Sequence, residues 1–97
     1  MKKTIAEWRK EIDELDRRMV ELLNERARAA QEIGRLKRHT DMPIYEPERE
    51  KTIFENVLRQ NRGPFPGPEL RDIYERIIAV MRNLQKDEML QSKERDS

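Results

Sequence analysis

An apolar stripe runs through the first part of the chain without a break in its spacing. It recurs every three or four residues from Ile5 to Leu36, a heptad-like pattern that indicates one long helix. Its members are Ile5, Trp8, Ile12, Leu15, Met19, Leu22, Ala29, Ile33 and Leu36. Thr4 and Glu7 fit a capping box, in which Thr4 is the N-cap and the glutamate reaches back to it. We therefore expect a helix over about residues 5–38.

Two clusters of turn-forming residues interrupt the rest of the chain. The stronger one is residues 62–68, where two glycines alternate with three prolines. The other is residues 40–43, which lies shortly before Pro47. The segments between these breaks are rich in Glu, Arg, Lys, Leu and Ala, residues that favour helix.

These segments predict two shorter helices. The second helix is expected over residues 47–61, with Glu46 near its N-cap and a proline at its first position, where a missing N–H does no harm. The third is expected over residues 68–90, and the polar tail 91–97 is expected to fray. The predicted fold class is all-α, with three helices in a single domain over residues 1–97.

Charge and composition exclude several classes of function. The chain has 21 Lys and Arg against 20 Asp and Glu, and this net charge of +1 argues against a strongly basic nucleic-acid binder or a polybasic membrane anchor. Cysteine is absent and His39 is the one histidine, so thiol catalysis and multi-histidine metal sites are not expected. No apolar run approaches a membrane span, and the first residues lack the apolar region of a signal peptide. We expect a cytoplasmic protein without metal or cofactor.

The length of the first helix bears on the assembly. A helix over residues 5–38 spans about 50 Å at 1.5 Å per residue. A compact chain of about 100 residues is only about 35 Å across, so two shorter helices cannot cover the whole apolar stripe. The sequence therefore predicts a homodimer in which the long helices lie side by side. The alternative is a bend near residues 26–28, which would give a monomer with four helices.

Cations along the first helix are candidates for ligand binding. Arg26 falls on the apolar stripe, where an unpaired charge is costly unless it has a partner or a ligand. The alternative is a buried ion pair with Glu25 or Glu50 of a neighbour. Lys37 lies about 16 Å further along the same face, so the two cations can converge on one anion. Arg9 lies about 25 Å from Arg26, and it can complete the same pocket only from the partner chain of an antiparallel dimer.

The shorter helices add further polar candidates. Arg49 lies beside Glu46 and Glu50 in the second helix, and Gln85 falls on the apolar face of the third. The alternatives are that Arg49 pairs with Glu46 and that Gln85 fixes the register of packed helices. The whole set suits a small dicarboxylate, because arginine matches carboxylates bidentately. A reaction that needs only orientation and charge stabilisation would require no covalent catalysis.

Five segments of the sequence follow one another in a recognisable order: residues 9–16, Glu25-Arg26, residues 33–37, residues 43–50 and Leu84-Gln85. In this order they resemble the all-helical chorismate mutases, and the resemblance covers about residues 5–90. The family implies an intertwined helical homodimer with two equivalent active sites. It also implies the Claisen rearrangement of chorismate to prephenate, a step towards Phe and Tyr, without a cofactor.

The resemblance implies roles by position. Arg26 and Arg9 of the partner subunit would hold the two substrate carboxylates, with Arg49 nearby. Lys37 and Gln85 would donate hydrogen bonds to the ether oxygen, which gains negative charge as the C–O bond breaks. Donors aimed at that oxygen bind the transition state better than the ground state.

Two carboxylates and one apolar residue complete the implied site. Glu46 and Glu50 would engage the ring hydroxyl and fix the chair-like conformer. Glu46 stands where some members have Asp, and Met81 stands where a small hydroxyl residue is expected, so Met81 would pack against the ring. Two alternative functions are an isochorismate–pyruvate lyase and a non-catalytic dimerisation module. Glu50 favours the mutase, since the lyases considered lack an acid there.

Overall fold

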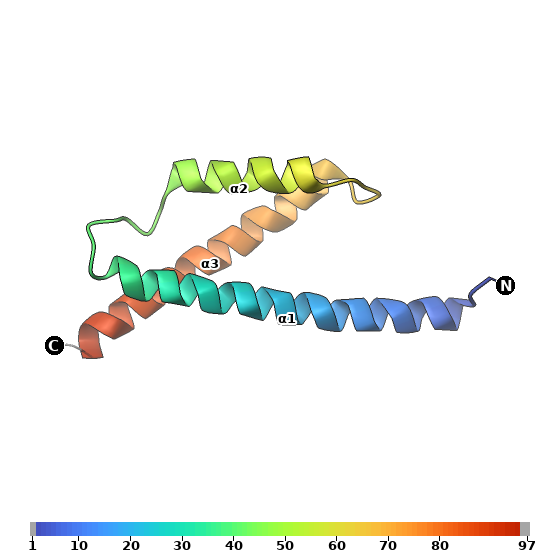
Figure 1. Cartoon of the computed structure of the whole chain (residues 1–97), viewed down its shortest axis with the longest axis horizontal. Helices are drawn as coiled ribbons and strands as arrows, with labels where there is room; N and C mark the ends of the chain where they lie inside the picture. Colours follow the sequence, from blue (N-terminus) through green and yellow to red (C-terminus); the bar gives the residue numbers. More distant parts are fainter. Residues whose placement is uncertain (1, 96–97) are drawn as a thin grey trace.

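The structure, a computed structural model, describes the backbone of residues 2–95 and the side chains of residues 2–91. It contains three helices and, within the described residues, no strand. These are α1 (Ile5–Lys37), α2 (Pro47–Gln60) and α3 (Gly67–Arg95). Figure 1 shows α2 running back along α1, while α3 crosses from the end of α2 to the C-terminal end of α1. The chain is therefore all-helical, as the sequence predicts.

The helix ends follow the local sequence signals. At the start of α1, the Thr4 hydroxyl accepts a hydrogen bond from the Glu7 amide at 3.1 Å, and the glutamate accepts one from the Thr4 amide at 3.3 Å. Glu46 is the N-cap of α2, but its side chain makes no capping hydrogen bond. Its carboxylate is thus available to a neighbouring element.

The end of α3 differs from the expectation. The sequence predicted a frayed tail from residue 91 onward. The helix instead continues to Arg95, so residues 91–95 are helical. This stretch contains neither glycine nor proline to stop a helix. Residues 96–97 of the predicted tail lie outside the described residues.

Helix α1 is continuous through residues 26–28, so the bent four-helix monomer is ruled out. The chain measures 63 × 27 × 15 Å and its radius of gyration is 17.5 Å. A compact chain of this length has a radius of gyration of about 13 Å. The N-terminal end of α1 extends beyond α2 and α3, as Figure 1 shows.

The core lies where α1 and α3 cross. Ala30, Ile78 and Met81 are buried there. The two backbones approach closely at Gly34, where an added Cβ would lie 2.9 Å from the Cα of Gln85. This glycine has a negative φ and stands inside a helix, so it is needed for the close approach and not for a special backbone conformation.

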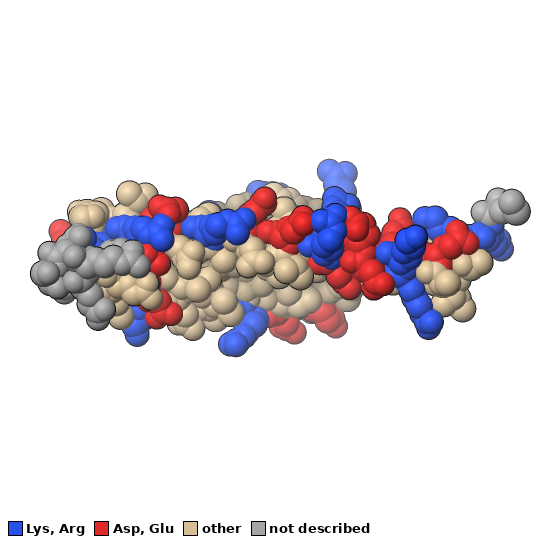
Figure 2. Space-filling model, turned by 90° about the horizontal axis from the view of Figure 1, so that it is seen from below, with Lys and Arg blue, Asp and Glu red and all other residues tan. Residues whose placement is uncertain are grey.

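Much of the apolar stripe is uncovered in the single chain. Trp8, Met19 and Leu22 are 52%, 59% and 60% exposed. Figure 2 shows uncharged surface over the part of one face where the helices lie together, whereas charged side chains dominate toward the N-terminal end of α1. Among the described residues, no helix combines the length and the apolar character needed to cross a membrane.

Candidate active site

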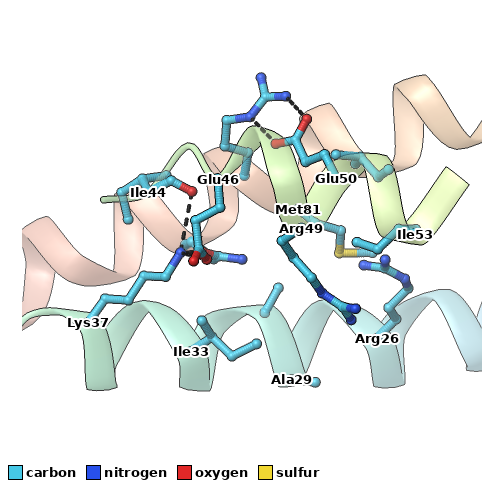
Figure 3. Close-up of a pocket in the computed structure, with 14 residues that line it drawn as sticks. Arg26, Ala29, Ile33, Lys37, Ile44, Glu46, Arg49, Glu50, Ile53 and Met81 are labelled. Carbon is cyan, nitrogen blue, oxygen red and sulfur yellow. Dashed lines mark hydrogen bonds and ion pairs between the residues drawn. The ribbon is translucent and has the colours of Figure 1, made fainter. Parts of the chain in front are cut away.

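A cavity of about 340 Å³ lies between α1 and α2, with α3 forming its remaining wall (Figure 3). Seven of the eight site residues predicted from the sequence line it: Arg26, Lys37, Glu46, Arg49, Glu50, Met81 and Gln85. The eighth, Arg9, is exposed near the start of α1 and does not line the cavity. The fold thus brings residues from three helices around one space.

Lys37 occupies one end of the cavity and is only 4% exposed. Its Nζ lies 2.8 Å from Glu46 Oε2 and donates hydrogen bonds to Gln85 Oε1 at 3.0 Å and to the Ile44 carbonyl at 3.3 Å. A buried charge is tolerated when it is paired and hydrogen-bonded, and these three acceptors meet that need. Helix α1 ends at this lysine, so its last turn places the ammonium group between α2 and α3.

The contact with Lys37 also orients the Gln85 amide. An ammonium group can only donate, so the amide must present its oxygen to Lys37 and its NH₂ group elsewhere. No described residue accepts a hydrogen bond from this NH₂ group. Gln85 therefore keeps a free donor next to the Lys37 ammonium, and both residues line the same cavity.

Arg26 and Arg49 face the cavity from opposite sides, one from α1 and the other from α2. Figure 3 shows both side chains directed into the space between these helices. Neither forms an ion pair with a described residue of its own chain, so within one chain Arg26 does not pair with Glu25 or Glu50 and Arg49 does not pair with Glu46. Two guanidinium groups without an acidic partner in one cavity are chemically suited to bind an anion.

Glu50 is paired with Arg82, a residue that the sequence analysis missed. Arg82 donates from Nε to Glu50 Oε2 at 3.0 Å and from Nη2 to Glu50 Oε1 at 2.7 Å. The hydrogen bonds to Glu50 raise the pKa of the Arg82 guanidinium, against an opposing effect of desolvation. Its spacing in the sequence could have identified Arg82 as a site residue, because it precedes Gln85 by one helical turn and so shares its face of α3.

The remaining wall is apolar. Met81 is 6% exposed, and Ile33, Ile53 and Ile78 line the same cavity. Met81 offers no hydrogen-bond donor, so it presents a packing surface. The lining carries four cations and two carboxylates, which leaves an excess of two positive charges. A small, partly apolar ligand with two negative charges matches this lining in both charge and polarity.

Comparisons with known proteins all point to the same family. The family model for chorismate mutase type II matches residues 8–86. The chain is 45% identical over 86 residues to a bifunctional chorismate mutase/prephenate dehydratase from Aquifex aeolicus, an alignment that covers 84% of this chain and 24% of the relative. The chain thus spans about a quarter of the length of that bifunctional relative.

Two shorter proteins are similar over more of their own length. A chorismate mutase from Methanocaldococcus jannaschii is 39% identical over 55 residues, covering 57% of this chain and 56% of the relative. A solved structure of chorismate mutase (form II) from Thermus thermophilus superposes with a TM-score of 0.81 at 36% identity, covering 84% of this chain and 93% of that chain. With a family model that matches most of its length and a three-helix fold shared with a solved member, the chain belongs to the chorismate mutase type II family.

Proposed function

We propose that this chain catalyses the rearrangement of chorismate to prephenate. The observation that carries the proposal is the pair of guanidinium groups, Arg26 and Arg49, that face one cavity without an acidic partner among the described residues. Chorismate carries two carboxylates, and arginine binds such groups with charge-assisted, often bidentate, hydrogen bonds. Membership of the chorismate mutase type II family supports the same reaction.

Lys37 and Gln85 are proposed to act on the ether oxygen of the substrate. In a Claisen rearrangement the C–O bond breaks ahead of C–C bond formation, so negative charge develops on this oxygen. The amide NH₂ of Gln85 is free to donate to that oxygen, and Lys37 would donate to it in place of its longest contact, the Ile44 carbonyl at 3.3 Å. Both donors stabilise the developing charge in the transition state more than in the ground state. The catalytic effect requires no covalent step and no proton transfer.

The two glutamates are proposed to bind the ring hydroxyl and to select the reactive conformer. Glu50 stands fixed by Arg82, and Glu46 is held by Lys37. Met81 and the neighbouring isoleucines exclude water on the apolar side of the ring. Restricting a flexible substrate to a chair-like geometry lowers the entropic cost of reaching the transition state.

A second copy of the chain is proposed to complete the site. The apolar stripe on the N-terminal half of α1 is exposed in one chain, and an exposed stripe of this length is typical of a protein–protein interface. In an antiparallel homodimer, the N-terminal part of α1 would pass the middle of its counterpart. Arg9 of the partner subunit would then join Arg26 at a substrate carboxylate.

The test is to identify the product. We expect the purified chain to convert chorismate to prephenate without added metal or nucleotide, as followed by chromatography. Release of pyruvate from isochorismate, with no prephenate from chorismate, would instead support the lyase. A folded, dimeric chain that converts neither compound would support a dimerisation module.

A further inference from the structure

Arg82 lines the cavity, yet in the proposed reaction it makes no contact of its own with the substrate. It forms a two-point ion pair with Glu50, with donor–acceptor distances of 3.0 and 2.7 Å. The side chains of Arg82 and Glu50 are 35% and 17% exposed, so solvent screens this pair less than it screens a pair on the open surface. Such fork-shaped pairs fix geometry as well as charge.

The Arg82 guanidinium is also held from a second side. Its Cζ lies 5.0 Å from the ring centroid of Tyr45, in the connection between α1 and α2. Arg82 thus links this connection, α2 and α3. The backbone of α2 packs against α3 and stays apart from that of α1, so the wall of the cavity formed by α2 depends on contacts of this kind.

The pairing of Glu50 affects the charge that a ligand would meet. Figure 3 shows the Glu50 carboxylate turned away from Arg26 and Arg49, which face the space below it. A carboxylate without a partner beside two guanidinium groups without partners would be attracted to them. If Glu50 turned to either arginine, it would neutralise part of the anion site.

We propose that Arg82 is a positioning residue that holds Glu50 away from Arg26 and Arg49 and so keeps both guanidinium groups available to an anionic ligand. The two-point pair leaves each Glu50 oxygen with a second lone pair, so the carboxylate still accepts a ligand hydroxyl. Arg82 acts through Glu50 and does not touch the ligand. This inference rests on the proposed function, since the ligand is taken to be chorismate.

The test compares four variants with the unsubstituted chain: Arg82→Met, Arg82→Lys, Glu50→Gln and the double variant Arg82→Met/Glu50→Gln. Arg82→Met is expected to raise KM for chorismate by about 10- to 100-fold, because the released carboxylate competes with the substrate for the arginines. Arg82→Lys keeps the positive charge but cannot form the two-point pair with Glu50. Its KM should therefore lie between that of the unsubstituted chain and that of Arg82→Met. In the double variant no released carboxylate is present, so KM should return to the value of Glu50→Gln alone.

A matched control separates this effect from simple destabilisation. Arg71 also joins α3 to α2, with its Cζ 4.3 Å from the Phe54 ring centroid, but it does not line the cavity. Arg71→Met should therefore leave KM unchanged even if urea denaturation shows a similar loss of stability. Recovery of KM in the double variant could not arise from misfolding.

Several results would overturn the inference. An unchanged KM in Arg82→Met would show that Glu50 does not compete. A raised KM that Glu50→Gln does not reverse would show that Arg82 contacts the substrate directly or acts only on stability. Inactivity of the unsubstituted chain on chorismate would overturn the proposed function itself, so the two failures are distinguishable.

Discussion

The backbone of α1 at Gly34 lies against the backbone of α3 at Gln85, so closely that a Cβ on the glycine would lie 2.9 Å from the Cα of Gln85. The atoms it would meet belong to the backbone, which cannot move aside as a side chain can. The contact therefore sets the separation of the two helices that carry Lys37 and Gln85. The hydrogen bond of 3.0 Å between these two side chains depends on it.

Gly34→Ala is the first prediction. Alanine favours helix by about 1 kcal/mol over glycine, but overpacking typically costs about 1–3 kcal/mol. We expect a net loss of stability in urea denaturation and a lower kcat, because the helices must separate. Arg28→Ala, at an exposed position on the same helix, is the control and should leave both unchanged. A more stable Gly34→Ala variant with unaltered kcat would contradict this account.

Lys37→Ala is expected to lower kcat by about 100- to 1,000-fold, the usual cost of removing one preorganised donor to a developing negative charge. It also leaves Gln85 without the contact that orients its amide. Steady-state kinetics should show the loss mainly in kcat. Lys51→Ala removes an exposed lysine of α2 outside the cavity, and it should behave as the unsubstituted chain does. Comparable losses in both variants would show that the effect is not local.

The pH dependence should change in Gln85→Glu. The amide of Gln85 donates at any pH, so the unsubstituted chain should stay active from neutral to mildly alkaline pH. A carboxyl group donates only when protonated, and an ordinary glutamate has a pKa of about 4.3. Lys37 would favour the ionised form and lower that pKa further. The variant should thus be nearly inactive at pH 7 and gain activity as the pH falls, whereas equal activity at pH 5 and 8 would argue against a role as donor.

Arg26→Ala separates an enzyme from a dimerisation module. Arg26 has no acidic partner among the described residues, so its removal breaks no ion pair and should not reduce the free energy of unfolding. We expect kcat/KM to fall by about 10- to 100-fold through the lost hydrogen bonds to a substrate carboxylate. A more stable dimer with no loss of activity would support the module.

Mixing experiments test whether two chains share each site. Arg9→Ala and Lys37→Ala should each be inactive alone, since Arg9 serves the partner's cavity and Lys37 its own. In a twofold-symmetric dimer, random exchange leaves about a quarter of the sites intact. We therefore expect about that fraction of the original activity after mixing. No recovery after subunit exchange has been confirmed by mass spectrometry would rule out shared sites.

The sequence alone was enough to predict three helices and most of the points where they begin and end. The capping box at Thr4, the proline at the start of α2 and the cluster at residues 62–68 are local signals, and helix formation responds to local signals. The continuation of α3 to Arg95 was missed because the polar composition of residues 91–97 indicated fraying, although the segment contains no glycine or proline to stop a helix. The spacing along α1 also indicated that one chain cannot cover the apolar stripe, and its exposure agrees with this.

Only the tertiary structure showed which side chains meet. Positions along one helix set the distances between residues of that helix, but they do not set the distance between Glu50 on α2 and Arg82 on α3. That distance depends on how closely the helices pack, and α1 and α3 approach each other closely at Gly34. Periodicity determined which residues lie on each inner face, whereas packing decided that Arg82 pairs with Glu50 and leaves Arg26 and Arg49 without acidic partners among the described residues.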